Sequence, residues 1–304
     1  MPYIVSVGAK LYFEEHGQGY PIIFIHEFES DFRQWEAQVR HFSRVYRCIT
    51  YSARGYPPSD VPVDPALYGW EYFVDDIAVV LHSLGIERAH VVGSSMGGYA
   101  ALQFGLRYPE RASAIVAAGA GSGSSPPDRD AWLRKSRILA RAFVERGMDA
   151  IARKMAHHPT RIRLKYKDPK GWQNFVEHLR QHSALGMCNT MAQYLALRPS
   201  LHDFHDQFSR MTIPVLLAVG DEDAPCLETN LMLKSALPAA GLWICPNTGH
   251  AMNLEEPAAF NAQVRNFLGA VERGSWKRGD PDDKFISTTK SIRTTPLHLN
   301  GVQQ

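Results

Sequence analysis

The stretch Ala89-His-Val-Val-Gly-Ser-Ser-Met-Gly-Gly98 decides how this chain is interpreted. Its first four residues are typical of a short buried strand, and helical spacing runs from Met96 to Arg107. Between them stands the pattern G-x-S-x-G, centred on Ser95. A serine on so tight a strand-to-helix turn has its hydroxyl lifted clear of the backbone, next to the positive end of a helix. The pattern predicts a nucleophile at Ser95, whereas a glycine-rich packing turn is the alternative.

The neighbouring Ser94 competes with Ser95 for this role. Only Ser95 has glycine two residues before it and two residues after it, at Gly93 and Gly97. Those glycines allow the close backbone approach that the turn needs. We therefore expect Ser95 to be the reactive serine.

Strands and helices alternate on both sides of this turn. Apolar runs and period-two patterns predict strands, and apolar spacing of three and four predicts helices. Such alternation with short loops implies a parallel sheet covered by helices on both faces. The expected strands are 3–7, 10–15, 22–25, 46–51, 89–92, 114–117, 213–219 and 242–245, and the expected helices are 31–43, 70–84, 96–107, 227–237 and 256–271.

The alternation stops between residues 122 and 210, where amphipathic helical stretches occur without a convincing strand. One of these helices should begin at Asp168-Pro169, with the aspartate as N-cap. Residues 129–180 carry fourteen Arg and Lys against five Asp and Glu. Such cations form either a solvated outer face or a site for an anionic substrate, and both interpretations stay open.

Length and composition exclude several classes of protein. A chain of 304 residues buries a large core, and 45% hydrophobic content is that of a globular protein. The sequence shows neither a membrane-length apolar run nor a signal peptide. Its net charge of +2 gives no reason to expect a nucleic-acid partner. The four cysteines fit no metal or redox spacing, so we expect reduced thiols, a cytoplasmic location and no metal.

A serine nucleophile needs a base and an acid that orients the base. His250 lies in a loop after the last expected strand, at the sheet edge where Ser95 should also lie. Gly220-Asp-Glu-Asp223 follows the strand at 213–219 and offers two acids at the same edge. Asp223 is preferred because it can point back towards the histidine loop, and Asp221 remains the alternative. The order Ser95, Asp223, His250 is an order used by known hydrolases.

These pieces together resemble the α/β-hydrolase superfamily, in particular its lidded branch of serine esterases, lactonases and carbon–carbon hydrolases. The resemblance covers about residues 3–272, and it makes Asp223 the firm choice of acid. It implies an α/β-hydrolase fold: a mostly parallel eight-stranded sheet with helices on both faces and a helical lid inserted between two strands. Its motifs are His26, Arg54-Gly-Tyr-Pro-Pro-Ser59, Gly93-Ser-Ser-Met-Gly-Gly98, Gly220-Asp-Glu-Asp223 and Gly249-His-Ala-Met-Asn-Leu-Glu-Glu-Pro257.

The resemblance also predicts the domains. The core should comprise residues 1–121 and 211–272, and the helical cap residues 122–210. Residues 273–304 are polar and without periodicity, and we expect a flexible C-terminal extension. Whether the chain forms a homo-oligomer stays open.

The loop His26-Glu27-Phe28 departs from the family pattern, in which glycine follows the histidine. By position, the backbone N–H groups of Phe28 and Met96 should form the oxyanion hole. Glu27 either turns away and pairs with an arginine such as Arg54 or Arg33, or contacts substrate or water, or damages the oxyanion hole. We expect a pair with Arg54 that braces the loop, with His26 beside it.

Three functions fit these residues. The first is cofactor-free hydrolysis of a small carboxylic ester or lactone through an acyl-enzyme. The second is another reaction on the same three residues: carbon–carbon cleavage of a product of aromatic-ring degradation, perhydrolysis or a lyase reaction. The third is a small-molecule receptor that has kept the fold and lost turnover. Epoxide and haloalkane hydrolysis are not expected, because related enzymes with those activities carry aspartate at the position that Ser95 occupies here.

Overall fold

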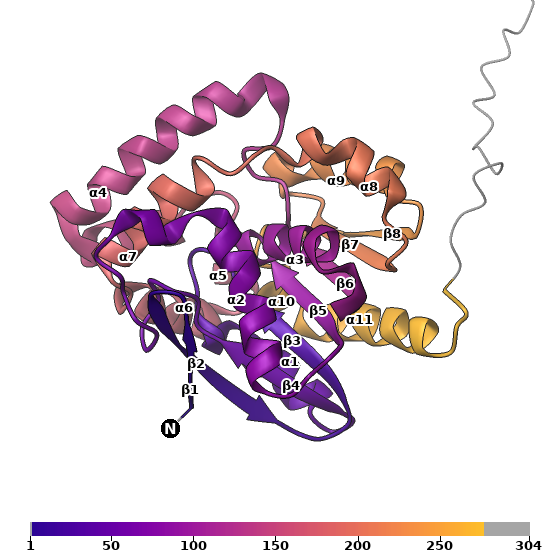
Figure 1. The fold of residues 1–304 in the computed structure, drawn as a ribbon. Helices are drawn as coiled ribbons and strands as arrows, with labels where there is room; N and C mark the ends of the chain where they lie inside the picture. Colours follow the sequence, from indigo (N-terminus) through magenta and orange to yellow (C-terminus); the bar gives the residue numbers. More distant parts are fainter. Residues whose placement is uncertain (1, 277–304) are drawn as a thin grey trace, which may run out of the picture.

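The computed structural model describes residues 2–276, and its centre is one eight-stranded sheet (Figure 1). All eight expected strands are present, each within about two residues of its predicted bounds. The strands are β1 (Tyr3–Ser6), β2 (Ala9–His16), β3 (Tyr20–Ile25), β4 (Tyr46–Tyr51), β5 (Ala89–Ser94), β6 (Ala112–Ala118), β7 (Val215–Gly220) and β8 (Ala240–Cys245).

The strand order is β1-β2-β4-β3-β5-β6-β7-β8. β1 pairs with β2, and β2 with β4, in antiparallel fashion, and every other neighbouring pair is parallel. The carboxyl ends of β3, β5, β6, β7 and β8 therefore meet along one edge, where the loops that follow them can share a site. This arrangement confirms the fold that the sequence predicted.

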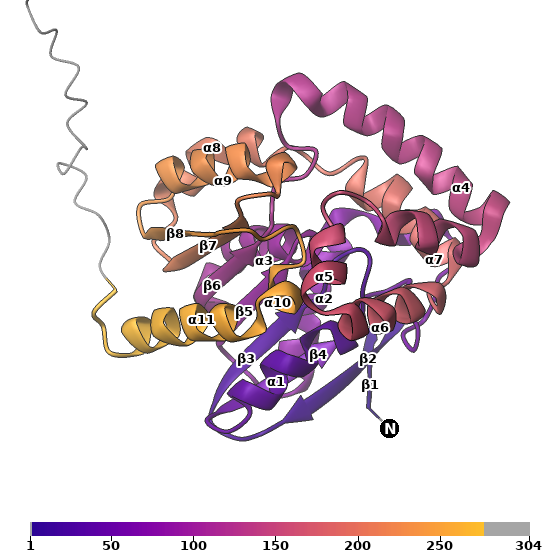
Figure 2. The same ribbon diagram turned by 180° about the vertical axis from the view of Figure 1, so that it is seen from behind.

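The sheet is buried on both faces because alternate residues of its strands enter two different cores. In β3, Ile23 and Ile25 pack into the core beneath α2 (Trp70–Ser83) and α3 (Met96–Arg107). Ile22 and Phe24 enter the core formed with α1 (Glu36–Phe42) and α11 (Pro257–Glu272). Figure 2 shows α1 and α11 covering the face opposite to α2 and α3. A continuous apolar run such as 22–25 is the signature of such a doubly covered strand.

The segment between β6 and β7 is helical throughout its regular elements, as predicted, and lies across the carboxyl edge of the sheet (Figures 1 and 2). Asp168 caps α6 by accepting from the N–H of Gly171, as expected. Gly147, with φ 74° and ψ 164°, divides α4 into two helical pieces. The helices are α4 (Arg129–Ala156), α5 (Ile162–Lys167), α6 (Pro169–Arg180), α7 (Ala184–Asn189) and α8 (His205–Arg210), with a π-helical stretch at Thr190–Leu195.

Two helices complete the core after β7: α9 (Ala224–Ala236), and α10 (Met252–Glu255), which precedes α11. α9 begins three residues earlier than predicted, because Pro225 occupies the first turn, where its missing N–H costs nothing. Within residues 2–276, every helix is too short or too polar to span a bilayer.

The first residues after α11 pack on the core. Trp276 donates its indole N–H to the carbonyl of Ala239 at 2.9 Å, and its ring meets that of Phe267 edge to face, with centroids 4.7 Å apart. The extension expected from residue 273 thus begins with a docked segment, and its remainder, 277–304, lies outside the described residues.

Candidate active site

Ser95 occupies a sharp turn between β5 and α3, with φ 51° and ψ −108°. Within residues 2–276, only Ser95 and Asn247 among non-glycine residues have positive φ. The turn requires its glycines: a Cβ on Gly93 would lie 2.1 Å from the carbonyl oxygen of Gly97. A Cβ on Gly97 would lie 2.2 Å from the carbonyl oxygen of Ile25. The backbone therefore holds Ser95 in a strained conformation at the carboxyl edge of the sheet.

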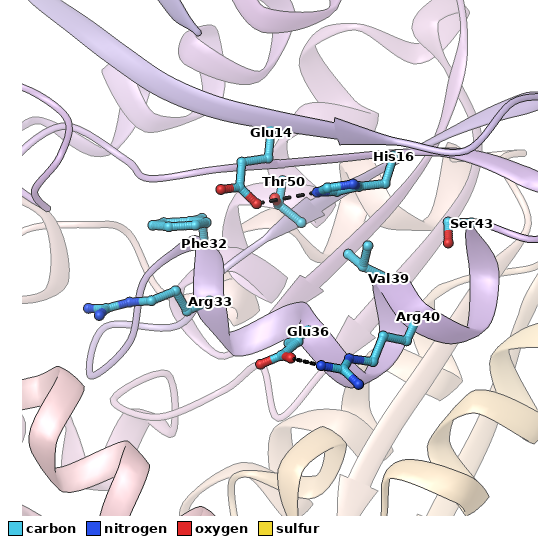
Figure 3. Close-up of a pocket in the computed structure, with 9 residues that line it drawn as sticks. All are labelled: Glu14, His16, Phe32, Arg33, Glu36, Val39, Arg40, Ser43 and Thr50. Atoms are coloured by element: carbon cyan, nitrogen blue, oxygen red, sulfur yellow. Dashed lines mark hydrogen bonds and ion pairs between the residues drawn. The ribbon is translucent and has the colours of Figure 1, made fainter.

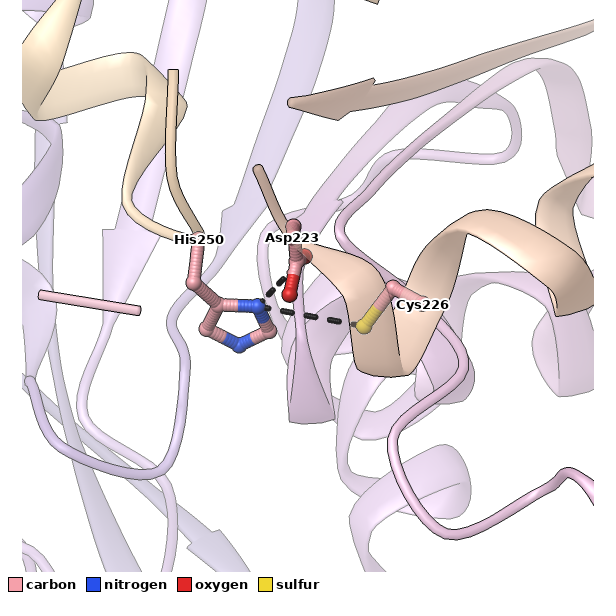
Figure 4. A group of neighbouring side chains, drawn as sticks. All are labelled: Asp223, Cys226 and His250. Carbon is pink, nitrogen blue, oxygen red and sulfur yellow. Dashed lines mark hydrogen bonds and ion pairs between the residues drawn. The ribbon is translucent and has the colours of Figure 1, made fainter. Parts of the chain in front are cut away.

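The three residues expected to act together lie in hydrogen-bond contact. His250 Nε2 is 2.8 Å from Ser95 Oγ, and His250 Nδ1 is 2.7 Å from Asp223 Oδ2. Figure 4 shows His250 facing Asp223 across the gap between two loops. Because a carboxylate only accepts, Nδ1 donates to Asp223, and in the neutral ring Nε2 is left to accept the proton of Ser95.

The environment of His250 sets its protonation. Burial alone lowers the pKa of His250, but the charge of Asp223 and its hydrogen bond outweigh burial and raise that pKa well above its usual 6.5. An imidazolium cannot accept a proton from Ser95. The arrangement therefore favours base action at pH values above this raised pKa, where the ring is neutral.

The competing residues take other positions. Asp221 accepts from the N–H of Thr248 at 3.1 Å and stands exposed on the loop. Ser94 is fully buried, and its hydroxyl has no hydrogen-bond partner among the described residues. The geometry thus brings Ser95, Asp223 and His250 together and leaves Asp221 and Ser94 aside.

A cavity of about 610 Å³ opens beside these three residues and lies between the sheet edge and the inserted helices. Its wall is largely apolar, with a few charged groups, which is typical of a site for a small molecule. The lining comprises Phe28, Glu29, Ser95, Ser122, Gly123, Ser125, Asp128, Ala131, Trp132, Lys135, Leu139, Met155, His158, Thr160, Arg161, Met191, Leu195, Arg198, Asp223, Ala224, Pro225 and His250.

The backbone N–H groups of Phe28 and Met96 have no protein acceptor among residues 2–276. Phe28 lines the cavity, and Met96 is the first residue of α3, directly after Ser95. The inserted segment fixes the start of α3, because Tyr194 donates its hydroxyl proton to the carbonyl of Met96 at 2.9 Å. Two free donors at these positions have the composition of an oxyanion hole.

His26 braces the loop that leads to Phe28. Its Nε2 accepts from the N–H of Ala53 at 2.9 Å, so its Nδ1 carries the proton and donates to the carbonyl of Glu27 at 2.7 Å. Burial lowers the pKa of His26 to about 4, and the ring stays neutral in the physiological range. Both ring nitrogens are used within the protein, which makes His26 a positioning residue.

The expected pair between Glu27 and Arg54 is wrong. Arg54 makes a bidentate, fully buried pair with Asp76 of α2, at 2.8 and 2.7 Å. Glu27 instead pairs with Arg161, whose Nη1 lies 2.8 Å from Glu27 Oε1. The other terminal nitrogen of Arg54 donates to the carbonyl of Leu67 at 2.9 Å, so its guanidinium is engaged without Glu27.

Arg161 also reaches Glu29, whose Oε2 lies 3.2 Å from its Nε. Burial raises the pKa of Glu29 above its usual 4.5, although the charge of Arg161 opposes this rise. Burial works against the charged form of Arg161, but Glu27 and Glu29 more than compensate and hold its pKa above the usual value. One guanidinium thus serves two carboxylates at the cavity wall.

Two groups near the site escaped the sequence analysis. Arg161 lies in the basic inserted segment, and no local pattern separates it from its neighbours. Cys226 lies with its Sγ 3.8 Å from His250 Nδ1, one helical turn after Asp223 (Figure 4). Because the sequence analysis began this helix at residue 227, it did not place Cys226 one helical turn after Asp223, where the two side chains can face the same way.

Another hollow, of about 430 Å³, lies between β2 and α1, away from Ser95 (Figure 3). Its charged side chains already have partners: Glu14 contacts His16, Glu36 pairs with Arg40, and Arg33 pairs with Asp31. It shares no residue with the cavity beside Ser95. Nothing in this hollow converges on a ligand.

Comparisons with known proteins agree with the fold. The sequence model described as alpha/beta hydrolase fold matches residues 20–257. The chain is 26% identical over 247 residues to 3-oxoadipate enol-lactonase 2 of Acinetobacter baylyi, covering 80% of this chain and 86% of that protein.

Two further similarities extend this comparison. The chain is 26% identical over 273 residues to 2-hydroxy-6-oxo-6-phenylhexa-2,4-dienoate hydrolase of Burkholderia cepacia, covering 85% of this chain and 91% of that protein. Among solved structures it is similar to Est816, described as an N-acyl homoserine lactone degrading enzyme, with 26% identity and a TM-score of 0.73. That match covers 88% of this chain and 100% of Est816.

Proposed function

This chain belongs to the alpha/beta hydrolase fold family, and from that membership we propose that it is a serine hydrolase of a small carboxylic ester or lactone. Ser95 is the nucleophile, His250 the general base and acid, and Asp223 the group that orients His250. The observation that carries the proposal is the continuous contact from Ser95 Oγ to His250 at 2.8 Å and from His250 to Asp223 at 2.7 Å.

In the first step His250 Nε2 takes the hydroxyl proton as Ser95 Oγ attacks the substrate carbonyl. The tetrahedral intermediate collapses when His250 returns this proton to the leaving oxygen, and Ser95 keeps the acyl group. Water then attacks the acyl-enzyme with His250 again as base. For a lactone the leaving oxygen stays attached to the acyl chain, so ring opening gives one hydroxy acid.

The carbonyl oxygen gains negative charge during both attacks. In this proposal the N–H groups of Phe28 and Met96 donate to it, and the N-terminus of α3 adds its partial positive charge. Neither donor has another acceptor among the described residues, so no bond within the protein must break first. The reaction needs only side chains, backbone and water.

We propose that residues 122–210 form the cap over a core of residues 1–121 and 211–272. Trp132, Met191 and Leu195 of the inserted segment line the cavity that Ser95 also lines. Cap side chains would therefore select the substrate, and their apolar character favours a substrate with a hydrocarbon part. A cytoplasmic location is proposed on the four unpaired cysteines.

Lactone substrates are supported by two relatives at 26% identity whose names specify lactone cleavage. Carbon–carbon hydrolysis of an aromatic-ring-cleavage product is the second candidate. The equally similar dienoate hydrolase favours it, together with the sequence Gly93-Ser-Ser-Met-Gly-Gly98. Both candidates use the same three residues.

A panel of substrates tests the proposal. Purified protein is assayed with p-nitrophenyl esters, with lactones of increasing chain length, and with ring-cleavage dienoates followed by loss of their visible absorbance. We expect turnover of esters or lactones and labelling of Ser95 by a fluorophosphonate, read by mass spectrometry. Turnover of dienoates alone would favour carbon–carbon hydrolysis, and failure of Ser95 to react would overturn the serine mechanism.

A further inference from the structure

Cys226 lies against the side of His250 that Asp223 also contacts (Figure 4). Its Sγ is 3.8 Å from His250 Nδ1 and donates to the carbonyl of Gly119 at 3.2 Å. The proposed ester hydrolysis has no use for this thiol. The side chain is fully buried.

The three side chains present a carboxylate oxygen, a sulfur and a ring nitrogen, all within 4.8 Å of one another. Within residues 2–276 this is the one group of three or more His, Cys, Asp and Glu that converges in this way. One oxygen of the cluster is also unengaged, because the buried Oδ1 of Asp223 has no hydrogen-bond partner among the described residues. A buried carboxylate oxygen without a donor is a site of negative potential that a cation would satisfy.

We propose that Asp223, Cys226 and His250 bind a zinc ion and that the bound ion switches the enzyme off. Zinc takes sulfur, imidazole and carboxylate ligands at about 2.0–2.3 Å, so donor atoms around it stand roughly 3.3–3.8 Å apart. The Cys226–His250 separation of 3.8 Å meets this requirement. The Asp223–His250 contact of 2.7 Å must widen, since these atoms now share a proton.

Inhibition follows from the tautomer of the imidazole. In the working site Nδ1 carries the ring proton and Nε2 accepts the proton of Ser95. Zinc occupies the lone pair of Nδ1, so in a neutral ring the proton moves to Nε2. The thiol proton of Cys226 leaves to solvent, and the thiolate binds the ion. His250 can then no longer accept the proton of Ser95.

A zinc ion can reach the cluster from the cavity, and the ligand types favour zinc over other divalent ions. Asp223 and Ser122 line the open cavity, and Ser122 Oγ lies 3.3 Å from Cys226 Sγ. Thiolate and imidazole select zinc over magnesium and calcium, which prefer oxygen ligands. The site should therefore discriminate among divalent ions.

Metal binding is measured first, since it does not depend on the proposed reaction. The Ser95→Ala protein is dialysed against zinc chloride with a zinc indicator as competitor, and bound zinc is counted. We expect one zinc per chain, and a weakening of at least about tenfold when Cys226→Ala is added, because even the loss of an outer-shell partner has that effect. Cys245→Ala, at another buried thiol, is the matched control and should leave binding unchanged.

Activity is measured second, and this arm rests on the proposed function. Wild-type protein in metal-free buffer should lose ester hydrolysis on addition of zinc and regain it with EDTA, whereas magnesium should have no effect. Each variant is compared with its own zinc-free rate, and Cys226→Ala should resist zinc. Unchanged zinc binding in Cys226→Ala overturns the site. Binding without inhibition of whichever substrate the enzyme turns over overturns the switch. Absence of turnover of esters, lactones and dienoates alike overturns the proposed function, while the zinc-binding measurement still decides the site.

Should Cys226→Ala fail to fold, Cys226→Ser replaces it, because it keeps the volume and loses the soft ligand. Cobalt binding is then read from the visible absorption that a thiolate–cobalt bond produces. We expect this absorption with wild-type protein and its loss with Cys226→Ser. The same absorption in both proteins overturns the assignment of Cys226.

Discussion

Arg161 Nη1 lies 2.8 Å from Glu27 Oε1, and neither side chain is more than 4% exposed. Arg161 comes from the inserted helical segment, and Glu27 immediately precedes Phe28. The pair therefore joins the segment over the cavity to the loop that offers one of the two free N–H groups. The second oxygen of Glu27 has no hydrogen-bond partner among the described residues, so this carboxylate depends on Arg161.

Removing Arg161 should be more damaging than removing Glu27. Arg161→Met leaves the buried carboxylate of Glu27 and the partly exposed carboxylate of Glu29 without their cation. Breaking a buried pair such as that of Glu27 costs about 3–5 kcal/mol. Glu27→Gln leaves Arg161 with Glu29 and should cost less. The double variant should recover part of the loss, as expected for coupled sites. Urea unfolding measures stability, and kcat reports whether the loop that carries Phe28, the proposed oxyanion donor, has shifted.

Arg163→Met is the matched control, since Arg163 lies two residues away and pairs with Glu222 at the surface. Its effect on stability should be small, because solvent screens exposed pairs. Strictly additive losses in the Glu27 and Arg161 cycle, or an equal loss in Arg163→Met, would contradict a specific role for the buried pair.

Ser95→Ala and His250→Ala should each lower kcat on the order of 10⁴-fold or more while the fold persists, and the double variant should lose no more. Both residues take part in the same proton transfer, so the loss of either one already abolishes that step. Circular dichroism and thermal unfolding verify the fold. A Ser95→Ala protein that kept most of its activity would rule out the covalent mechanism.

Asp223→Asn and Asp221→Asn separate the two acids. Asp223 holds the proton on His250 Nδ1, so its amide variant should approach the loss of His250→Ala, on the order of 10⁴-fold in kcat. Asp221 accepts from backbone N–H groups such as that of Thr248, so its variant should retain most activity. A larger loss in Asp221→Asn would mean that the acid has been assigned to the wrong residue.

The pH dependence of kcat/KM should report the raised pKa of His250. In the proposed mechanism the neutral ring is the base, so kcat/KM should fall as the pH decreases through a value above 6.5. In Asp223→Asn the charge that raises this pKa is gone and burial, which lowers it, remains. The acid limb of the residual activity should therefore move to lower pH. An unmoved limb would assign this titration to another group.

Local pattern was sufficient for the strands, the helices that flank them and the turn at Ser95. α3 has its predicted bounds, Met96–Arg107, because the Gly-rich turn and Pro109 limit it at both ends. The start of α9 was missed because Asp223-Ala-Pro reads as a loop, although proline is favoured in a first helical turn. The alternation of strands and helices predicts a parallel sheet. The sequence therefore also predicted that Ser95, Asp223 and His250 lie together at its carboxyl edge.

Charge pairing could not be predicted in the same way. Glu27 and Arg161 are 134 residues apart, and many other arginines of the inserted segment offered the same chemistry. The sequence did contain an indication of the true partner of Arg54. Asp76 lies among the apolar positions of α2, where a buried acid needs a cation. Which of two arginines approaches Glu27 is decided by how the inserted segment packs, and no local pattern encodes that packing.

Gly97→Ala should disturb the turn far more than Gly98→Ala. A Cβ at residue 97 would lie 2.2 Å from the carbonyl oxygen of Ile25, so β3 and α3 must separate. At residue 98 the nearest atom is the carbonyl oxygen of Ala118 at 3.1 Å, a tight contact that small shifts relieve. We expect a loss of kcat and of melting temperature in the first variant. Equal effects of both changes would show that the close packing of α3 against β3 at Gly97 is not what requires a glycine there.

Two truncations should separate the docked residues after α11 from the remainder of the chain. A protein ending at Trp276 keeps the hydrogen bond to Ala239 and the ring contact with Phe267. A protein ending at Arg273 loses both and uncovers Gly241, over which the indole lies. Fully burying a large apolar side chain contributes about 1.5–3 kcal/mol. Trp276 is partly buried, so the shorter protein should lose less than this and unfold at a lower urea concentration. Both should keep kcat/KM within a few-fold, because neither lacks a residue of the cavity, and a large loss of activity in the protein ending at Trp276 would assign residues 277–304 a part in the site.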